Sequence, residues 1–322
     1  MKPATAGNSP GFGTNNRNGV DVIQILDGVA YQVKRDGPFE VKAHDLGNGH
    51  LEASAVRKST AKELDWSPQV IADHLEMMER YREEHAEEIR ERNLQRAAKR
   101  ARTAIRRLCK AMGCTTLLTL TYRACEADLA RCKADLKEFN RRVQRVLPGF
   151  RFVAGFEKQK RGAWHVHMAT GNIPRSFLKF ATGGVPILVK SFDVLRAIWR
   201  SVTKDRGGNI DVSRRKRHSQ KSPAQVAAYI SKYITKAFAE GDKWSNRWTS
   251  YGARTWVPVD PSKPQGAGMW RSVVPAAHVL GQVDQLADAV VLVYGLMGEQ
   301  HEVTNARLDR WGEWFSLAAE SG

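Results

Sequence analysis

The sequence is poor in cysteine and has no apolar run long enough to cross a bilayer. Its four cysteines form no CxxC pair and lack the dense, even spacing of a disulfide scaffold, which predicts free thiols in a reducing compartment. They are Cys109, Cys114, Cys125 and Cys132. The most apolar run, residues 286–297, contains Asp288 and falls short of the about 18 residues that a membrane span needs. We therefore expect no membrane partner.

Acidic residues are also scarce. The chain holds 34 Asp and Glu against 51 Lys and Arg, which gives a formal net charge of +17 and a pI of about 9.9. Such a surplus is expected of a protein that approaches a polyanion, so nucleic acid is the first partner to consider. The alternative is a protein with a basic surface and no polyanionic partner.

Composition and periodicity divide the chain into four parts. Residues 1–20, rich in Gly, Asn and Pro and without the apolar stretch of a signal peptide, are expected to be a flexible tail. Residues 21–112 form an N-terminal accessory region, in which Asp-Gly steps predict a small β meander over 21–43. Ser67-Pro68 then predicts the start of a long helix that continues to about Ala111. Residues 243–322 are predicted to be a C-terminal region of aromatic and basic loops followed by helices over about 276–297 and 302–318.

Residues 113–242 carry the most specific pattern. Residues 115–123 alternate like a strand, residues 129–146 repeat like an amphipathic helix that Pro148 ends, and residues 150–157 and 163–170 form a predicted hairpin. A second helix around 192–202 and a short strand near 209–213 complete a split β-α-β-β-α-β unit. The predicted fold class is α+β, with two helices on one face of an antiparallel sheet in a ferredoxin-like arrangement.

His165 and His167 lie on the second strand of the predicted hairpin, where residues i and i+2 point to the same face. Pairing the hairpin about Lys160 puts Gly155 opposite His165 and Glu157 diagonally beside it, with room for an ion above the glycine. Two imidazoles and a carboxylate suit a divalent ion such as Mg²⁺ or Mn²⁺ that polarises a phosphate oxygen, and the ligand types also admit zinc. Alternatively, the histidines are incidental and Glu157 is a charge at the hairpin end.

A capping box at Ser222-Pro223 predicts a helix over residues 223 to about 239, with the sequence AYISKYITK. Tyr229 and Tyr233 lie at the edge of its apolar stripe, one turn apart, and Lys232 and Lys236 lie further out. A phenol near cations or a metal-bound phosphate can be a nucleophile. The alternative is that the rings extend the apolar stripe and the lysines are solvated.

Together and in this order, the strand LLTLTYR, the stretch EKQKRGAWHVHM and the helix YISKYITK resemble the HUH endonuclease superfamily over residues 115–240. Within it they are similar to the two-tyrosine initiators of rolling-circle replication in small phages and plasmids. The resemblance implies that His165 and His167, with Glu157, hold a divalent metal. It also implies that Tyr229 or Tyr233 attacks the scissile phosphate, which gives a 5′-phosphotyrosine and a free 3′-OH, while Lys232 and Lys236 neutralise charge in the transition state.

The resemblance also implies cytoplasmic work in a bacterial host on single-stranded origin DNA, with a host DNA polymerase. The chain has no G-x-x-x-x-G-K-[ST] loop, so we expect no nucleotide cofactor and a separate host helicase. Two other hypotheses stay open: a relaxase or single-strand transposase of the same superfamily, and a non-catalytic DNA-binding copy-control protein.

Two basic stretches are predicted to contact DNA phosphates. Residues 90–110 contain nine Lys or Arg and one acid, Glu91, and residues 214–217 precede the tyrosine helix. The residues singled out are Arg100, Arg102, Arg106, Arg214, Arg215, Lys216 and Arg217. The alternatives are a solvated helix face and an exposed loop. Tryptophans after residue 242 either stack on bases or pack in the core.

Overall fold

We describe a computed structural model of the 322-residue chain. It describes residues 22–171, 173–180, 184, 186–214, 224–225, 227–229, 247–257, 269–298, 301–308 and 314–321. Helices occur with antiparallel sheets, so the α+β class is confirmed. The chain forms two compact units: Met1–Ala43, Glu52–Arg90 and His278–Ala318 make the first, and His44–Leu51, Glu91–Ala277 and Ala319–Gly322 the second.

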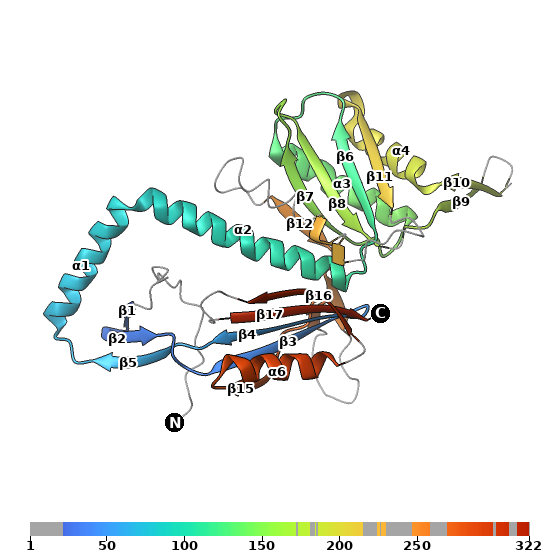
Figure 1. Ribbon diagram of the computed structural model, residues 1–322. Helices are drawn as coiled ribbons and strands as arrows, with labels where there is room; N and C mark the ends of the chain where they lie inside the picture. Colours follow the sequence, from blue (N-terminus) through green and yellow to red (C-terminus); the bar gives the residue numbers. More distant parts are fainter. Residues whose placement is uncertain are drawn as a thin grey trace, which may run out of the picture. The chain divides into compact units, whose positions relative to one another are not determined.

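A five-stranded sheet, here called the core sheet, organises the second unit (Figure 1). Its strands lie in the order β11-β6-β8-β7-β12 and pair antiparallel. They are β6 (Thr116–Tyr122), β7 (Phe152–Lys158), β8 (Trp164–Thr170), β11 (Gly208–Arg214) and β12 (Trp248–Tyr251). The first four match predicted strands. The fifth lies in a stretch predicted to be a loop, because its four residues gain their order from pairing with β7 rather than from a pattern of their own.

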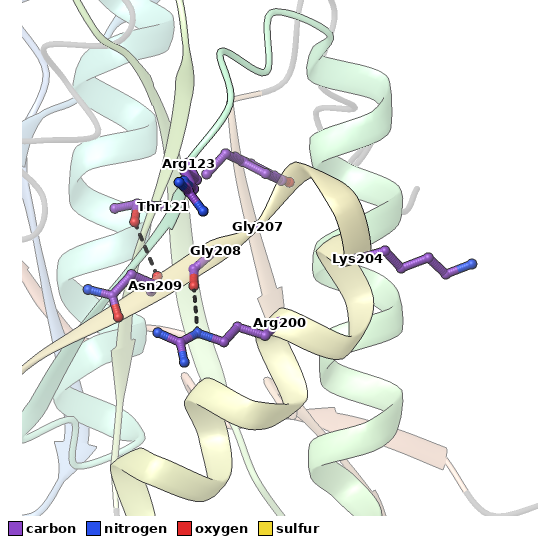
Figure 2. A pocket seen from close by; sticks show the side chains of 8 residues that line it. Thr121, Arg123, Arg200, Lys204, Gly207, Gly208 and Asn209 are labelled. Atoms are coloured by element: carbon purple, nitrogen blue, oxygen red, sulfur yellow. Dashed lines mark hydrogen bonds between the residues drawn. The ribbon is translucent and has the colours of Figure 1, made fainter.

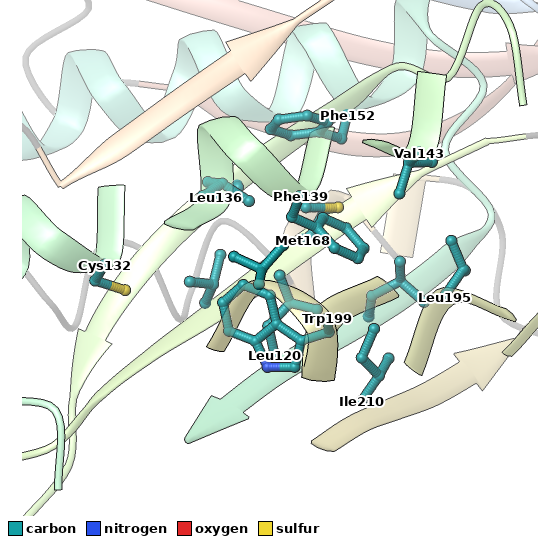
Figure 3. Close-up of a cluster of buried hydrophobic side chains, with 14 of the residues drawn as sticks. Leu120, Cys132, Leu136, Phe139, Val143, Phe152, Met168, Leu195, Trp199 and Ile210 are labelled. Atoms are coloured by element: carbon teal, nitrogen blue, oxygen red, sulfur yellow. The ribbon is translucent and has the colours of Figure 1, made fainter. Parts of the chain in front are cut away.

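Helices α3 (Leu129–Val146) and α4 (Ser191–Thr203) bury one face of the core sheet (Figure 3). Asp128 begins α3, since its carboxylate accepts hydrogen bonds from the backbone N–H groups of Ala130 and Arg131. Alternate strand residues meet both helices in one cluster. Its members include Leu118, Leu120, Phe139, Phe156, Trp164, Val166, Met168, Leu195 and Trp199.

The opposite face of the core sheet is covered as well, at one end. Residues Ala101 to Met112 of α2 (Ala86–Ala111) and of the turn after it form a second buried cluster with Val153 of β7 and Ala169 of β8. The sequence interpretation treated this as the face without a core. The cover was not foreseen because it comes from a helix that precedes the sheet and whose pattern gives no information on where it docks.

The hairpin of β7 and β8 differs in register from the prediction. Glu157 pairs with His165 and Gly155 with His167, so the prediction that Gly155 lies opposite His165 is wrong by two residues. The loop is centred on Arg161 because Gly162 adopts φ +88° and donates a turn hydrogen bond to Gln159, which makes a three-residue loop. A shift of two residues keeps every side chain on its predicted face.

The predicted long helix is interrupted. It is two helices, α1 (Pro68–Glu84) and α2, with His85 between them at φ −109°. Ser67 begins α1 as predicted, since its hydroxyl accepts a hydrogen bond from the N–H of Val70.

Two sheets lie before α1 or draw strands from both chain ends. β1 (Val22–Leu26), β2 (Val29–Lys34) and β5 (Thr60–Leu64) form a sheet in the order β1-β2-β5, and Asp27-Gly28 makes its tight turn as predicted. A second five-stranded sheet has the order β15-β3-β4-β17-β16. Its strands are β3 (Phe39–Gly47), β4 (His50–Arg57), β15 (His278–Val283), β16 (His301–Leu308) and β17 (Trp314–Ser321). The predicted meander over 21–43 is thus wrong in part, because β3 leaves β2 and pairs with β15.

The C-terminal prediction is corrected most. The helix expected over 276–297 is strand β15 followed by α6 (Leu286–Met297), and the helix expected over 302–318 is strands β16 and β17. Short apolar runs fit both periods, and pairing with strands 230 or more residues away decides for sheet, as in the pairing of His278 with Ala43. Hairpins β9 (Ser176–Phe180) with β10 (Pro186–Lys190) and β13 (Arg254–Val257) with β14 (Met269–Ser272), and a 3-10 turn η1 (Lys204–Arg206), complete the elements. None of the helices in the described part of the chain is long and apolar enough for a membrane span.

Candidate functional site

His165 and His167 lie side by side on β8, on the face of the core sheet opposite the α3–α4 cluster; we call this face the histidine face. Their neighbours in the sheet place Glu157 opposite His165 and Gly155 opposite His167. The two imidazole centroids are 6.5 Å apart. The strand alternation predicted from the sequence therefore brings two imidazoles and a carboxylate together, and a glycine leaves the space between β8 and β12 without a side chain.

Glu157 contacts the more distant histidine. Its Oε2 lies 2.7 Å from Nε2 of His167, diagonally across the hairpin. The other ring nitrogen of His167, Nδ1, is 3.3 Å from the hydroxyl of Thr119, which pairs with His167 from β6. Both nitrogens are thus engaged, which fixes the orientation of this ring.

His165 is in the opposite state. Only 9% of the residue is exposed, and among the described residues nothing forms a hydrogen bond with its buried Nε2. Burial, followed by the nearby His167 and Arg161, lowers the pKa of His165 to about 4, although Glu157 opposes this shift. At neutral pH the ring is therefore uncharged, with a buried nitrogen lacking the partner that such an atom normally finds.

The donor types on the histidine face suit a divalent ion. A neutral imidazole with a buried, unpartnered nitrogen and a carboxylate 2.7 Å from a second imidazole are the donors such an ion takes. Ligand atoms around a small octahedral ion lie about 3 Å from one another, close to the Glu157–His167 spacing. Within the described residues, however, no group of three His, Cys, Asp or Glu side chains converges on one point. The donor set fits an ion provided that the His165 ring turns toward the pair.

Tyr229 belongs to the segment that docks on the histidine face. Residues 224–225 and 227–229 are helical, as predicted, and Tyr229 is 47% exposed. Ala227, two residues earlier, is fully buried in the cluster that contains Val153 and Ala169. Ala169 and His167 are two residues apart on β8 and share a face. The start of the tyrosine helix thus packs one strand position beyond the histidines.

The remaining predicted site residues divide into two groups. Arg100 and Arg102 are exposed and Arg106 is half-buried on α2. Tyr233, Lys232, Lys236, Arg215, Lys216 and Arg217 lie outside the described residues, as does the side chain of Arg214 at the end of β11.

The structure adds residues that the sequence interpretation missed. Crossing the sheet from β11 to β12, Asp211 pairs with Thr119, Thr119 with His167, His167 with Gly155, and Gly155 with Trp248. Alternation in TTLLTLTYR indicated which face Thr119 occupies. No local signal pointed to Asp211 or Trp248, because their positions depend on strand pairing between distant segments.

The fold and site define an α+β protein with an antiparallel core sheet that carries a His-x-His pair and a docked tyrosine helix. Residues 115–238 match the model of a family of replication-associated proteins of the ORF2 type. The match spans less than half of the chain and runs from the residue before β6 through the tyrosine helix. It supports a role in DNA replication. No curated protein and no solved structure matches the chain.

Proposed function

We propose that this chain is a replication initiation endonuclease that nicks one DNA strand at an origin and later rejoins it. The observation that carries the proposal is the burial of Ala227 with Val153 and Ala169, which brings the helix of Tyr229 onto the face that bears His165 and His167. The family match to replication-associated proteins over the same segment supports it. The strand order β11-β6-β8-β7, with α3 and α4 on one face, agrees with the split β-α-β-β-α-β unit.

His165, His167 and Glu157 would hold a divalent ion, Mg²⁺ or Mn²⁺. When bound, such an ion polarises a phosphate oxygen and neutralises charge that develops on it. The chain prepares this site in two ways. Burial keeps His165 neutral and ready to donate its lone pair, and the Thr119 hydroxyl beside Nδ1 leaves Nε2 of His167 to face Glu157.

A helix tyrosine supplies the nucleophile. Its phenolic oxygen bonds to the scissile phosphorus, the bond from phosphorus to the 3′ oxygen breaks, and the phenol proton passes to solvent as the leaving oxygen takes one up. The products are a 5′-phosphotyrosine and a free 3′-OH that a host polymerase can extend. Tyr229 and Tyr233 would alternate in successive cleavages, with Lys232 and Lys236 offsetting the charge of the transition state.

The test is formation of a covalent adduct. Labelled single-stranded origin DNA with Mn²⁺ should give a protein–DNA band that survives denaturant, and EDTA or His165→Ala should abolish it. Changing both Tyr229 and Tyr233 to Phe should abolish it too, whereas each single change leaves part of the first cleavage. Tyr251→Phe is a matched control, because Tyr251 on β12 is also 47% exposed and is not a proposed nucleophile.

Full adduct yield in the Tyr229/Tyr233 double variant would refute tyrosine attack by this helix. Binding of origin DNA without any adduct would favour the copy-control alternative, in which Glu157 and His167 simply form a hydrogen bond. Adduct formation only on transfer origins or element ends would favour a relaxase or transposase.

A further inference from the structure

A basic cavity of about 560 Å³ lies at the edge of the core sheet, away from the tyrosine helix cluster (Figure 2). The end of β6, the start of β11, α4 and η1 line it. The lining residues are Thr121, Tyr122, Arg123, Arg200, Lys204, Gly207, Gly208 and Asn209. Three of the eight are cations and none is an acid.

These three cations are not engaged by carboxylates. In the described part of the chain, Arg123, Arg200 and Lys204 form no ion pair, and all three are exposed. Arg200 donates only to the carbonyl of Gly208, at 3.1 Å, which leaves the ends of its guanidinium available (Figure 2). The cavity therefore concentrates positive charge that nothing nearby neutralises.

The acids closest in the fold are occupied elsewhere. Arg206 points inward and donates to both carboxylate oxygens of Asp135 and to Glu126, and Tyr122 donates to Asp135 from β6. This buried network consumes the negative charge beneath the cavity. It also anchors η1, whose Lys204 stands at the cavity wall.

The backbone around the cavity is held by further contacts. Gly207 adopts φ +58°, and a side chain at Gly208 would lie 2.6 Å from Nε1 of Trp199. That indole instead donates to the carbonyl of Thr121, and the N–H of Arg123 donates to Gly207. The cavity is thus shaped by the packing of α4 against β6 and β11, which fixes the positions of the cations in advance of a ligand.

The cavity adjoins the histidine face. Thr121 and Asn209 pair with each other and lie on the same face as Thr119, whose hydroxyl meets His167. Two residues along a strand span about 7 Å. Arg161, exposed in the hairpin loop, donates to the carbonyl of Tyr122 and is among the charges that lower the pKa of His165. A basic path thus leads from His165 past Arg161 to Arg123, with Asp211 as the acid on the neighbouring strand position.

We propose that the cavity of Arg123, Arg200 and Lys204 binds a backbone phosphate of the single DNA strand, next to the phosphate that lies over the histidines. The inference rests on the proposed nicking function for the identity of the strand. It assigns this cavity the task of setting the register of the strand, so that the correct phosphate reaches the tyrosine.

The chemistry favours a phosphodiester of a polymer. Two guanidiniums and an ammonium suit a phosphate, since arginine presents paired donors to its oxygens. A free nucleotide shares that phosphate chemistry. The polar strip of Thr119 and Thr121 that continues onto the histidine face matches a strand running out of the cavity, which a free nucleotide would not fill.

The test compares two triple variants of the full chain. Arg123→Gln, Arg200→Gln and Lys204→Asn remove the cavity charges, and Asn tolerates the positive φ of Lys204, which is 52°. The control removes three charges from α3 on the opposite face, as Arg131→Gln, Arg141→Gln and Arg145→Gln. Binding of fluorescent single-stranded oligothymidylate is measured in EDTA over a range of salt, with thermal melting to check that each variant folds.

The cavity variant should bind about tenfold more weakly, and its log–log salt slope should fall by about 0.7 for each phosphate that the variant no longer neutralises. The control should change little. Equal weakening in both triples would overturn the proposal, because general charge would then explain binding. Thymidine monophosphate that binds the parent protein as tightly as the oligomer would overturn assignment to a strand. The single change Arg200→Lys keeps the charge and should retain most binding.

Because EDTA prevents cleavage, this result is independent of nicking. Weak binding by the cavity variant together with no adduct from the parent protein would remove the proposed function and keep the phosphate site. Adduct formation with unchanged oligomer binding by the cavity variant would remove the phosphate site alone. In an active parent protein, the cavity variant should also cut at displaced positions, seen on a sequencing gel.

Discussion

His165 combines two properties that seldom occur together in a merely structural histidine. Its ring is buried and uncharged, and its Nε2 has no hydrogen-bond partner in the part of the chain that the structure describes. A buried polar atom without a partner costs about 1–3 kcal/mol, so folding alone does not account for its presence. On the histidine face, beside Glu157 and His167, an ion would satisfy it.

The first prediction concerns pH. The pKa of His165 is 6.5 when unperturbed and about 4 in the fold, so between these values the unfolded chain binds more protons than the folded one. In EDTA, the contribution of His165 is fully present above pH 6.5 and is lost as pH falls toward 4, by about 3 kcal/mol at most. Urea unfolding at several pH values should show this loss, and His165→Gln should flatten it. An equal pH dependence in both proteins would contradict the assignment.

The second prediction concerns the thiols. Cys125 is exposed, whereas Cys109, Cys114 and Cys132 are buried, and burial chiefly raises the pKa of Cys132 to about 12. Because the thiolate is the reactive form, native protein at mild alkaline pH should take up one alkyl group from iodoacetamide, on Cys125. Mass spectrometry of peptides would identify it. Rapid labelling of Cys132 without unfolding would contradict the burial of α3 against the sheet.

At the scale of elements, the docking of the tyrosine helix is the decisive contact. A small residue is required where Ala227 meets Val153 and Ala169, since all three are fully buried. Strand alternation could be read from the local pattern at β6, β7 and β8. The place where the following helix lands could not, because it depends on which face α3 and α4 leave open.

The third prediction tests this contact. Ala227→Glu places a charge in an apolar cluster, so the helix should detach from the histidine face and adduct formation should fall by about 100-fold or more, as when a catalytic group is misplaced by about an ångström. Circular dichroism should change little, since the α3–α4 cluster does not include Ala227. Ala228→Glu, at a neighbouring exposed position, is the control. Equal activity of the two variants would refute the docking.

At the scale of the whole molecule, the core sheet needs elements outside the family match. β12 covers the edge of β7, and α2 covers Val153 and Ala169. Both lie beyond residues 115–238. An uncovered strand edge and an exposed apolar face favour aggregation.

The fourth prediction follows from this. A fragment of residues 115–238 should aggregate or melt well below a fragment of residues 86–277, which keeps α2 and β12. Each large apolar side chain left exposed costs about 1.5–3 kcal/mol. Light scattering and thermal melting of the two fragments would decide. Equal stability would mean that α2 and β12 are dispensable for the core sheet.

The amino-acid sequence by itself determined the strands and helices of the core, the face that carries His165, His167 and Glu157, and the basic character of the chain. These follow from local periodicity and composition, which each segment carries alone. The tertiary structure decided the hairpin register, through Gly162, and the sheet that joins β3 to β15 and β17. It also decided the cover over Val153 and the convergence of Arg123, Arg200 and Lys204 on one cavity. Each of these depends on contacts between segments far apart in the chain, whose free energies no local pattern records.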